Sequence, residues 1–177
     1  DNDVALTQGV VGFDTAVNTI TDALNRLTFT AASHDRVMIV EVMGRSAGHL
    51  ALHAGIAGGA DVILIPEVPY SIESVCCHLH QLRDRWGRKF AIVVVAEGVK
   101  TAADSRTEMM DAKPTCGISQ YLANEIMGCL PKPIEVRVSI LGHIQRGGIP
   151  TAADRLLASA FGKFAVDLVA RGETQQM

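Results

Sequence analysis

Two glycine-containing segments of the sequence carry cations that could hold a phosphate group. The first is Met43, Gly44 and Arg45, which is followed by small residues that can begin a helix. Backbone N–H groups at a helix N-terminus favour an anion, and the Arg45 guanidinium adds a positive charge beside them. We expect this segment to stabilise a phosphate or a transferred phosphoryl group. A glycine turn with a solvated arginine is the alternative.

The second segment runs from Gly142 to Gly148 and contains His143 and Arg146 three residues apart. Its glycines would let a ligand approach the backbone closely, and a further cation, Arg137, lies just upstream. A histidine in a loop usually has no special role. The surrounding glycines and the two arginines nevertheless favour an anion site here.

Three carboxylates complete the set of residues to which chemistry can be assigned. Glu97 directly follows an apolar strand, where a buried carboxylate needs a cation or a sugar hydroxyl as its partner. An ordinary exposed glutamate is the alternative. Asp1 and Asp3 point to the same side of an extended chain, so one could act as a base while the other holds a divalent cation. Taken alone, this pair is more simply an acidic chain terminus.

The elements that must position these residues are visible as short runs rich in Val and Ile. Such runs predict strands that are covered on both faces, at residues 37–43, 61–66, 90–96 and 135–141. Strands that alternate with helices imply right-handed crossovers and a mainly parallel sheet. The predicted fold class is therefore α/β, a three-layer sandwich. In such sheets ligands bind beyond the carboxyl ends of the strands, which is where the candidate residues fall.

Apolar residues recur every three or four positions in the segments between and around these runs. This spacing predicts helices over residues 13–27, 72–86 and 118–126, with Gly87 placed to end the second. The pattern Thr151-x-x-Asp154 predicts the capped start of a last helix. That helix carries apolar residues at Leu157, Phe161, Phe164 and Leu168.

Composition limits the classes of partner. The chain has 177 residues, 48% of them hydrophobic, which is enough for one sizeable core, and we interpret residues 1–177 as one unit. A net charge of −3 provides no field for nucleic acid or for an anionic membrane surface, and we expect neither as a partner. No apolar run reaches the roughly 18–20 residues of a membrane span. The polar start without a Met suggests that the true N-terminus lies elsewhere.

The four cysteines, Cys76, Cys77, Cys116 and Cys129, show no C-x-x-C spacing, and two of them are adjacent. This arrangement suits neither a disulfide framework nor a zinc site. A reducing, cytoplasmic setting is the simplest expectation.

Several motifs together resemble one known family. They occur in the order seen in bacterial 6-phosphofructokinases: Asp1-Asn2-Asp3, GFDTA (12–16), SHDR (33–36), EVMGR (41–45), IAGGAD (56–61), PEV (66–68), AEG (96–98), LGHIQRGG (141–148) and ADRLLA (153–158). EVMGR and GHIQRGG are specific motifs, and together they are far stronger than a lone glycine pattern. The resemblance spans essentially the whole chain.

The resemblance implies phosphoryl transfer to the 1-hydroxyl of fructose 6-phosphate, and it assigns roles by motif position. It makes Asp1 the general base, places Asp3 at a Mg²⁺ site, and gives Arg45 a catalytic role. The residues that it implies for substrate binding are Arg36, Met43, Gly44, Arg45, Glu97, Arg137, His143 and Arg146. Arg36 and Arg137 would reach the 6-phosphate of a neighbouring subunit, which implies a homo-oligomer, a dimer or tetramer, with shared sites.

The sequence also departs from the family pattern. The glycine-rich nucleotide loop and the metal segment that the family places upstream are absent, so we interpret the chain as the sugar-phosphate-binding portion. ATP is the expected donor, pyrophosphate the close alternative, and a non-catalytic sugar-phosphate-binding module or inactive fragment the alternative of another class. Asp61, Arg88 and Lys89 fit the family's effector site. Thr28 and Trp86 replace basic residues expected there.

Overall fold

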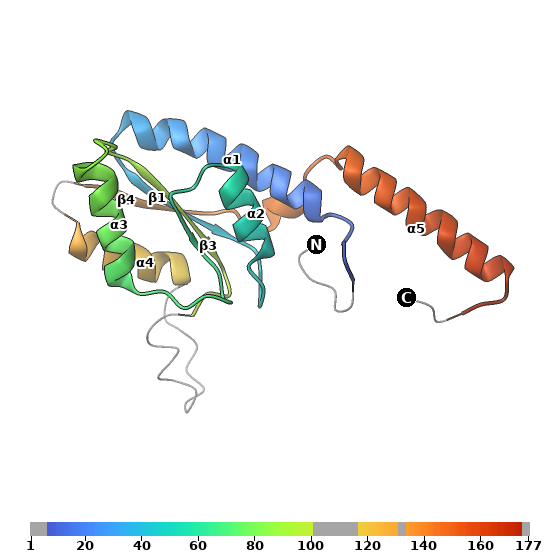
Figure 1. Ribbon diagram of the computed structural model, residues 1–177. Coiled ribbons are helices and arrows are strands. Elements are labelled where there is room, and N and C mark those ends of the chain that lie inside the picture. The colour runs from blue at the N-terminus through green and yellow to red at the C-terminus, as the bar shows by residue number, and fades with distance from the viewer. Residues whose placement is uncertain (1–6, 101–116, 131–133, 175–177) are drawn as a thin grey trace, which may run out of the picture.

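The computed structural model describes residues 7–100, 117–130 and 134–174. Within them one four-stranded sheet has the order β2-β3-β1-β4, and every neighbouring pair is parallel (Figure 1). Its strands are β1 (Val37–Val42), β2 (Val62–Leu64), β3 (Ala91–Ala96) and β4 (Val136–Ile140). All four predicted strands are present; three are slightly shorter than their apolar runs, and β2 covers only the middle of its run, 61–66. The prediction of an α/β fold with a mainly parallel sheet is confirmed.

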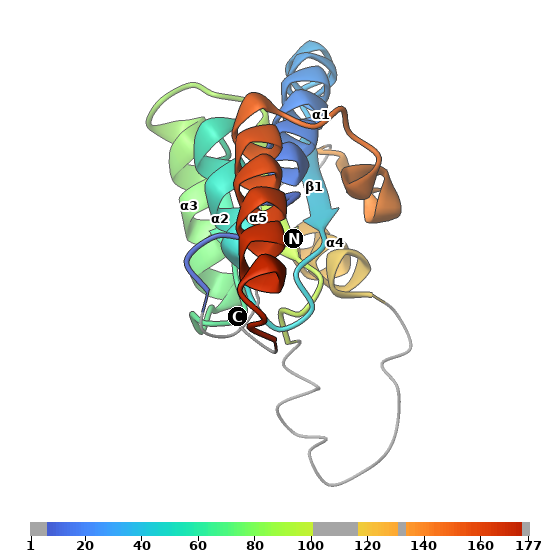
Figure 2. The same ribbon diagram turned by 90° about the vertical axis from the view of Figure 1, so that its right-hand side faces the viewer.

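Helices cover both faces of this sheet. They are α1 (Phe13–Ser33), α2 (His49–Ala57), α3 (Ile72–Asp84), α4 (Ile118–Cys129), the short 3₁₀ helix η2 (Gly142–Arg146) and α5 (Ala152–Ala170). The chain crosses the sheet in one direction through α2 and in the other through α3 and α4. Right-handed crossovers therefore place α2, with α1 beside it, on one face and α3 with α4 on the other (Figures 1 and 2). None of the helices in the described ranges is both long enough and apolar enough to cross a bilayer.

The core lies on the two central strands, β1 and β3. Every residue of β3 is buried, because its sequence AIVVVA is apolar throughout and both of its faces are covered. Ile20 and Leu24 of α1 close one face, while Leu122 and Ile126 of α4 close the other, and all four side chains are fully buried. The helical spacing of apolar residues seen in the sequence thus corresponds to packing against the sheet.

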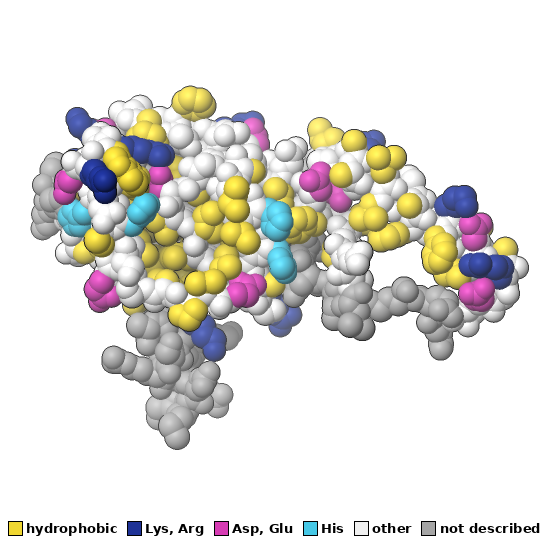
Figure 3. All heavy atoms as spheres, in the orientation of Figure 1, with side chains coloured by type: hydrophobic (Ala, Val, Ile, Leu, Met, Phe, Trp, Pro, Cys, Tyr) yellow, Lys and Arg dark blue, Asp and Glu magenta, His cyan; other side chains and the backbone are white. Residues whose placement is uncertain are grey.

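Helix α5 departs from this pattern, because it extends away from the sheet (Figures 1 and 2). Its predicted cap is present: the backbone N–H of Asp154 donates to Oγ1 of Thr151 over 3.3 Å. Most of its apolar side chains are exposed, and Figure 3 shows them as yellow patches along the helix. The exposed large ones are Leu156, Phe161, Phe164, Val166 and Val169. Monomeric proteins rarely leave such a contiguous apolar face open.

The cysteine prediction was wrong in one respect. Cys76 of α3 and Cys129 at the end of α4 form a disulfide, with their Cα atoms 6.3 Å apart. The two residues are 53 positions apart in sequence, and they meet because α3 and α4 pack side by side on one face of the sheet. The positions of these two cysteines in the sequence do not indicate that they form a pair. Cys77 is a free, exposed thiol, and Cys116 lies outside the described residues.

Candidate functional site

The strands β3, β1 and β4 end side by side, at what we call the carboxyl edge. The strands are parallel and in register: Val42 pairs with Ala96, and Glu41 pairs with Ile140. The residues that follow them, Met43–Arg45, Glu97 and Gly142–Arg146, therefore leave the sheet at adjacent points. The structure thus brings together the two cationic segments and the carboxylate that the sequence singled out.

Hydrogen bonds join these three segments to one another. The backbone N–H of Met43 donates to Oε1 of Gln145 over 3.2 Å, and the N–H of Gly44 donates to Oε1 of Glu97 over 3.3 Å. Nε2 of Gln145 donates in turn to the carbonyl of Gly142 over 2.8 Å. Gln145 is only 1% exposed, so its amide is committed to these contacts. Sequence reasoning missed this residue, because it read only the cations of its motif.

Two glycines, Gly44 and Gly98, shape the Met43–Arg45 segment and its contact with the residues that follow β3. A Cβ atom on Gly98 would lie 2.0 Å from the carbonyl oxygen of Arg45, far inside van der Waals contact. A Cβ atom on Gly44 would lie 2.5 Å from the carbonyl oxygen of Ala47, and Gly44 also has a φ of +147°. A side chain at Gly98 would push the Arg45 loop away from the end of β3, whereas a side chain at Gly44 would distort the turn between Gly44 and Ala47.

The charged side chains of the carboxyl edge face outward. Arg45, His143 and Arg146 are exposed, whereas Met43 is half-buried and Gly44 is buried. Glu97 is also exposed, and its contact with a cation or a sugar hydroxyl stays a prediction. Its carboxylate accepts from a backbone N–H, which anchors the neighbouring loop.

The N-terminus of α2 is occupied by a side chain of the protein. The N–H of Gly48, the N-cap residue, donates to Oε1 of Glu67 over 2.8 Å. An internal carboxylate thus accepts from one amide at this helix start, and the prediction that this segment binds a phosphate stays a prediction.

Two more helices begin in the same way. The N-caps of α1 and α4 are Gly12 and Gly117, neither of which offers a capping side chain. Glu41 of β1 accepts hydrogen bonds from the backbone N–H and the hydroxyl of Ser119 at the start of α4. Asp154 accepts from the N–H of Gly12 over 2.9 Å and from the N–H of Thr15 over 2.8 Å at the start of α1. Carboxylates that are remote in sequence thus satisfy helix ends that local residues cannot.

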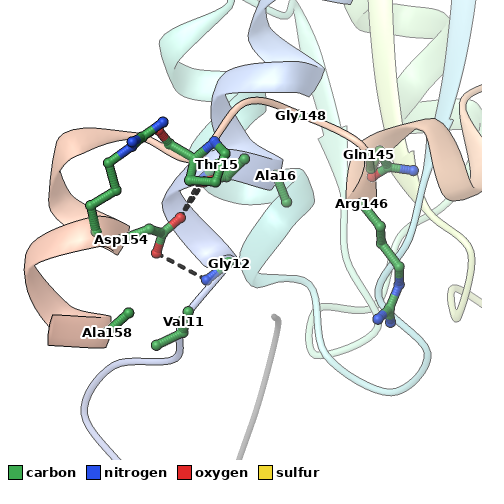
Figure 4. A pocket seen from close by; sticks show the side chains of 11 residues that line it. Val11, Gly12, Thr15, Ala16, Gln145, Arg146, Gly148, Asp154 and Ala158 are labelled. Carbon is green, nitrogen blue, oxygen red and sulfur yellow. Dashed lines mark hydrogen bonds between the residues drawn. The ribbon is translucent and has the colours of Figure 1, made fainter. Parts of the chain in front are cut away.

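Asp154 lies at the wall of a pocket of about 440 Å³, formed by the start of α1, the turn after η2 and the start of α5 (Figure 4). Gln145 and Arg146 line the opposite side. The Thr15 hydroxyl also donates to the Asp154 carboxylate. Burial raises the pKa of Asp154, but the hydrogen bonds from Thr15 and Gly12 outweigh burial and hold that pKa below its usual value.

The opposite ends of the strands form a second charged region, which we call the amino edge. Arg36 precedes β1 and Arg137 is the second residue of β4, and both guanidinium groups contact the carboxylate of Glu135. Burial raises the pKa of Glu135, but the hydrogen bond from Arg36 and the charge of Arg137 lower it to a net value below the usual range. Figure 3 shows Lys and Arg side chains (dark blue) at this end of the molecule. The structure therefore does not bring these two arginines to the His143 and Arg146 of their own chain.

The three predicted effector residues also lie at the amino edge. Nη1 of Arg88 is 2.7 Å from Oδ1 of Asp61, which is 5% exposed, and the guanidinium stacks on Phe90 at 4.4 Å. Oδ2 of Asp61 accepts from the N–H of Ile92 over 2.8 Å. Lys89 Nζ lies 3.8 Å from Oδ2 of Asp35. An anion arriving here would compete with these internal carboxylates.

Two predicted residues cannot be placed. Asp1 and Asp3 lie outside the described residues. Among the residues that are described, no group of three or more His, Cys, Asp or Glu side chains is arranged to hold a metal ion.

Comparison with known proteins decides the family. The phosphofructokinase family profile matches residues 1–169, almost the whole chain. This chain belongs to the phosphofructokinase family. It is 68% identical over 180 aligned residues to a protein of Nostoc sp. named ATP-dependent 6-phosphofructokinase 2, covering 100% of this chain and 50% of that protein. It is 63% identical to the ATP-dependent 6-phosphofructokinase of Thermosynechococcus vestitus, covering 100% of this chain and 47% of that one.

Solved structures of phosphofructokinases share the fold. The structure of phosphofructokinase from Saccharomyces cerevisiae matches 99% of this chain and 22% of its own with a TM-score of 0.81 and 35% identity. The pyrophosphate-dependent phosphofructokinase from Marinobacter aquaeolei matches 97% of this chain and 43% of its own with a TM-score of 0.79 and 27% identity. This phosphofructokinase chain spans about half the length of the curated relatives it matches.

Proposed function

We propose that this chain forms the acceptor-binding part of an ATP-dependent 6-phosphofructokinase. Such an enzyme transfers a phosphoryl group to the 1-hydroxyl of fructose 6-phosphate and gives fructose 1,6-bisphosphate, a step of glycolysis. The observation that supports the proposal is the carboxyl edge, where two cationic segments and Glu97 are joined by hydrogen bonds. Phosphoryl transfer depends mainly on positioning and on charge stabilisation, and this edge offers both.

Each exposed side chain of the carboxyl edge has a role in this proposal. Arg45 stabilises the transferred phosphoryl group, while His143 and Arg146 hold the 6-phosphate. Met43 and Gly44 line the sugar. One oxygen of Glu97 anchors the Gly44 N–H, and the carboxylate still has lone pairs that can accept from sugar hydroxyls. Gln145 and Gly98 hold these groups in place without touching the substrate.

Asp1 and Asp3 supply the remaining chemistry in this proposal. Asp1 takes the proton of the 1-hydroxyl, a role that typically contributes about 10²- to 10⁴-fold to the rate. The Asp3 carboxylate is the type of oxygen ligand that Mg²⁺ prefers, and the ion when bound neutralises charge on the donor phosphates. The support for both roles is the family motif Asp1-Asn2-Asp3 and the spacing of the two carboxylates.

ATP is the proposed donor. The two relatives with 68% and 63% identity are both named ATP-dependent, whereas the neighbour named pyrophosphate-dependent is 27% identical. Pyrophosphate remains the alternative donor. A non-catalytic sugar-phosphate-binding module is the alternative of another class, because the chain spans only about half the length of its relatives.

A homo-oligomer with shared sites, a dimer or tetramer in the cytoplasm, completes the proposal. Arg36 and Arg137 lie at the amino edge, and the six residues of β1, which span about 20 Å along the sheet, separate Arg36 from the Met43–Arg45 segment. A phosphate held by Arg146 is therefore out of their reach within one chain. Their pairing through Glu135 presents two guanidinium groups together, which suits a phosphate of a neighbouring subunit. An effector role for Asp61, Arg88 and Lys89 stays a prediction.

The test compares donors and separates binding from turnover. The chain should be assayed with ATP and with pyrophosphate within a protein of its relatives' full length. Turnover with pyrophosphate but not ATP would overturn the proposed donor. Asp1→Ala should lower kcat by roughly 10²- to 10⁴-fold and leave fructose 6-phosphate affinity by calorimetry unchanged.

Arg146→Ala should weaken binding of fructose 6-phosphate at least tenfold, since a charge-assisted contact to phosphate is lost. Arg26→Ala is the matched control, because Arg26 is an exposed arginine that pairs with Asp22 on the outer side of α1. Equal binding by both variants would refute the proposed phosphate site. Sugar-phosphate binding without turnover in the full-length protein would favour the non-catalytic alternative.

A further inference from the structure

The Cys76–Cys129 disulfide joins the two helices that cover one face of the sheet (Figure 1). Cys76 lies in the second turn of α3 and is 6% exposed, whereas Cys129 is the last residue of α4 and is half-buried. Nε2 of His80, one turn after Cys76, lies 3.1 Å from the carbonyl oxygen of Cys129. Cys129 is therefore the more exposed of the two cysteines, and we expect an incoming thiol to attack its sulfur first.

The disulfide joins the C-terminal end of α4 to α3. The other end is held by the Glu41 carboxylate at Ser119, directly behind the residues of the carboxyl edge. Opening the disulfide removes the covalent link between α3 and the C-terminal end of α4, whereas the Glu41 contacts lie at the other end of the helix. We therefore expect reduction to lower the stability of the α3–α4 layer more than it alters the carboxyl edge.

We propose that Cys76 and Cys129 form a site of reversible thiol–disulfide exchange that takes a dithiol reductant. A thiolate of the reductant attacks the sulfur of Cys129, the bond between the two cysteines breaks, and Cys76 leaves as a thiolate that takes up a proton. The second thiol of the reductant then attacks its own first sulfur and releases Cys129, which is also protonated. Two electrons pass to the protein, and the reductant ends as a disulfide. The oxidised dithiol reverses the sequence.

Cys77 provides an internal reference for testing this site. It follows Cys76 on α3, is exposed and carries a free thiol. Neighbouring residues of a helix do not face the same direction, so Cys77 points away from the partner sulfur. It should be alkylated in the oxidised and in the reduced protein alike, whereas Cys76 and Cys129 should be alkylated only after reduction.

The experiment equilibrates the 177-residue chain in mixtures of oxidised and reduced dithiothreitol, followed by acid quench, alkylation and peptide mass spectrometry. We expect a linked Cys76–Cys129 peptide under oxidising conditions, its reversible loss under reducing ones, and a Tm lowered by roughly 4–16 °C on reduction. Cys77→Ser should behave as wild type. Cys129→Ser should give a Tm that reductant does not change.

Alkylation of Cys76 and Cys129 in the oxidising mixture would overturn the proposal, and so would a wild-type Tm that is insensitive to reduction. The wild-type comparison requires no variant to fold. None of these readouts involves sugar or phosphoryl donor, so failure here is distinct from failure of the proposed function.

Discussion

Asp154→Ala should be among the most destabilising single changes in this chain. The Asp154 side chain is 4% exposed and accepts three hydrogen bonds, from the N–H groups of Gly12 and Thr15 and from the Thr15 hydroxyl. Loss of a helix cap costs about 0.5–2 kcal/mol, and a buried polar group left without a partner costs about 1–3 kcal/mol. Since these terms overlap, we expect the free energy of unfolding to fall by about 2–4 kcal/mol.

The assay is urea unfolding followed by circular dichroism, with Asp167→Ala as the matched control. Asp167 lies on the same helix, is largely exposed and pairs only with a solvated ammonium group, that of Lys163. Exposed pairs of this kind contribute about 0.3–0.5 kcal/mol. If Asp154→Ala destabilised the chain no more than Asp167→Ala does, the capping role assigned to Asp154 would be refuted.

The pH dependence gives an independent check. The pKa of Asp154 is lower in the folded chain than its usual value of 3.8, so the folded state favours the charged carboxylate. The stability that this carboxylate contributes is therefore present above the unfolded value and is lost as the pH falls through the lower, folded value. The free energy difference between wild type and Asp154→Asn should be largest near neutral pH and should shrink below 3.8. A difference that grows on acidification would contradict this sign.

Three further predictions concern the carboxyl edge and α5. Gly98→Ala should weaken fructose 6-phosphate binding at least tenfold while the circular dichroism spectrum stays unchanged, because the added Cβ would meet the Arg45 carbonyl. As the control, Gly128→Ala should bind as wild type, because the space around Gly128 is open. Gln145→Leu should lower the free energy of unfolding by about 1–3 kcal/mol in urea titrations, since the Met43 N–H loses its partner. The 177-residue chain should enhance the fluorescence of an anilinonaphthalene sulfonate dye through the exposed face of α5, and a chain of the relatives' full length should do so much less.

The sheet and its covering helices could be predicted because their information is local. The apolar run AIVVVA in β3 reflects a strand that is buried on both faces, and the apolar spacing of α1 reflects a helix that is buried along one stripe. Both patterns are visible in residues that are close together in the sequence. General rules for parallel sheets then place the carboxyl ends of these strands at one edge of the sheet. The convergence of Met43–Arg45 and Gly142–Arg146 was predictable for this reason.

What could not be predicted depends on contacts between residues far apart in sequence. Gln145 looks like an ordinary polar loop residue until the backbone N–H of Met43 is placed beside it. Cys76 and Cys129 meet only because α3 packs on α4. The exposure of α5 was equally hidden, since its apolar spacing is the same whether or not a partner covers it.

The capping pattern explains why the carboxyl edge uses side-chain cations. Helices α1, α2 and α4 all begin at this side of the sheet, and each helix N-terminus carries about half a positive charge. Uncapped, these three ends would attract any anion without regard to its shape. Asp154, Glu67 and Glu41 accept hydrogen bonds from amides at these ends, so in the proposed function a phosphate gains most from the exposed arginines and histidine. The planar guanidinium of arginine can donate two directed hydrogen bonds to a phosphate, so it selects by geometry as well as by charge. A helix N-terminus alone is less selective. The glycine N-caps and their remote carboxylates thus complement the proposed phosphate site.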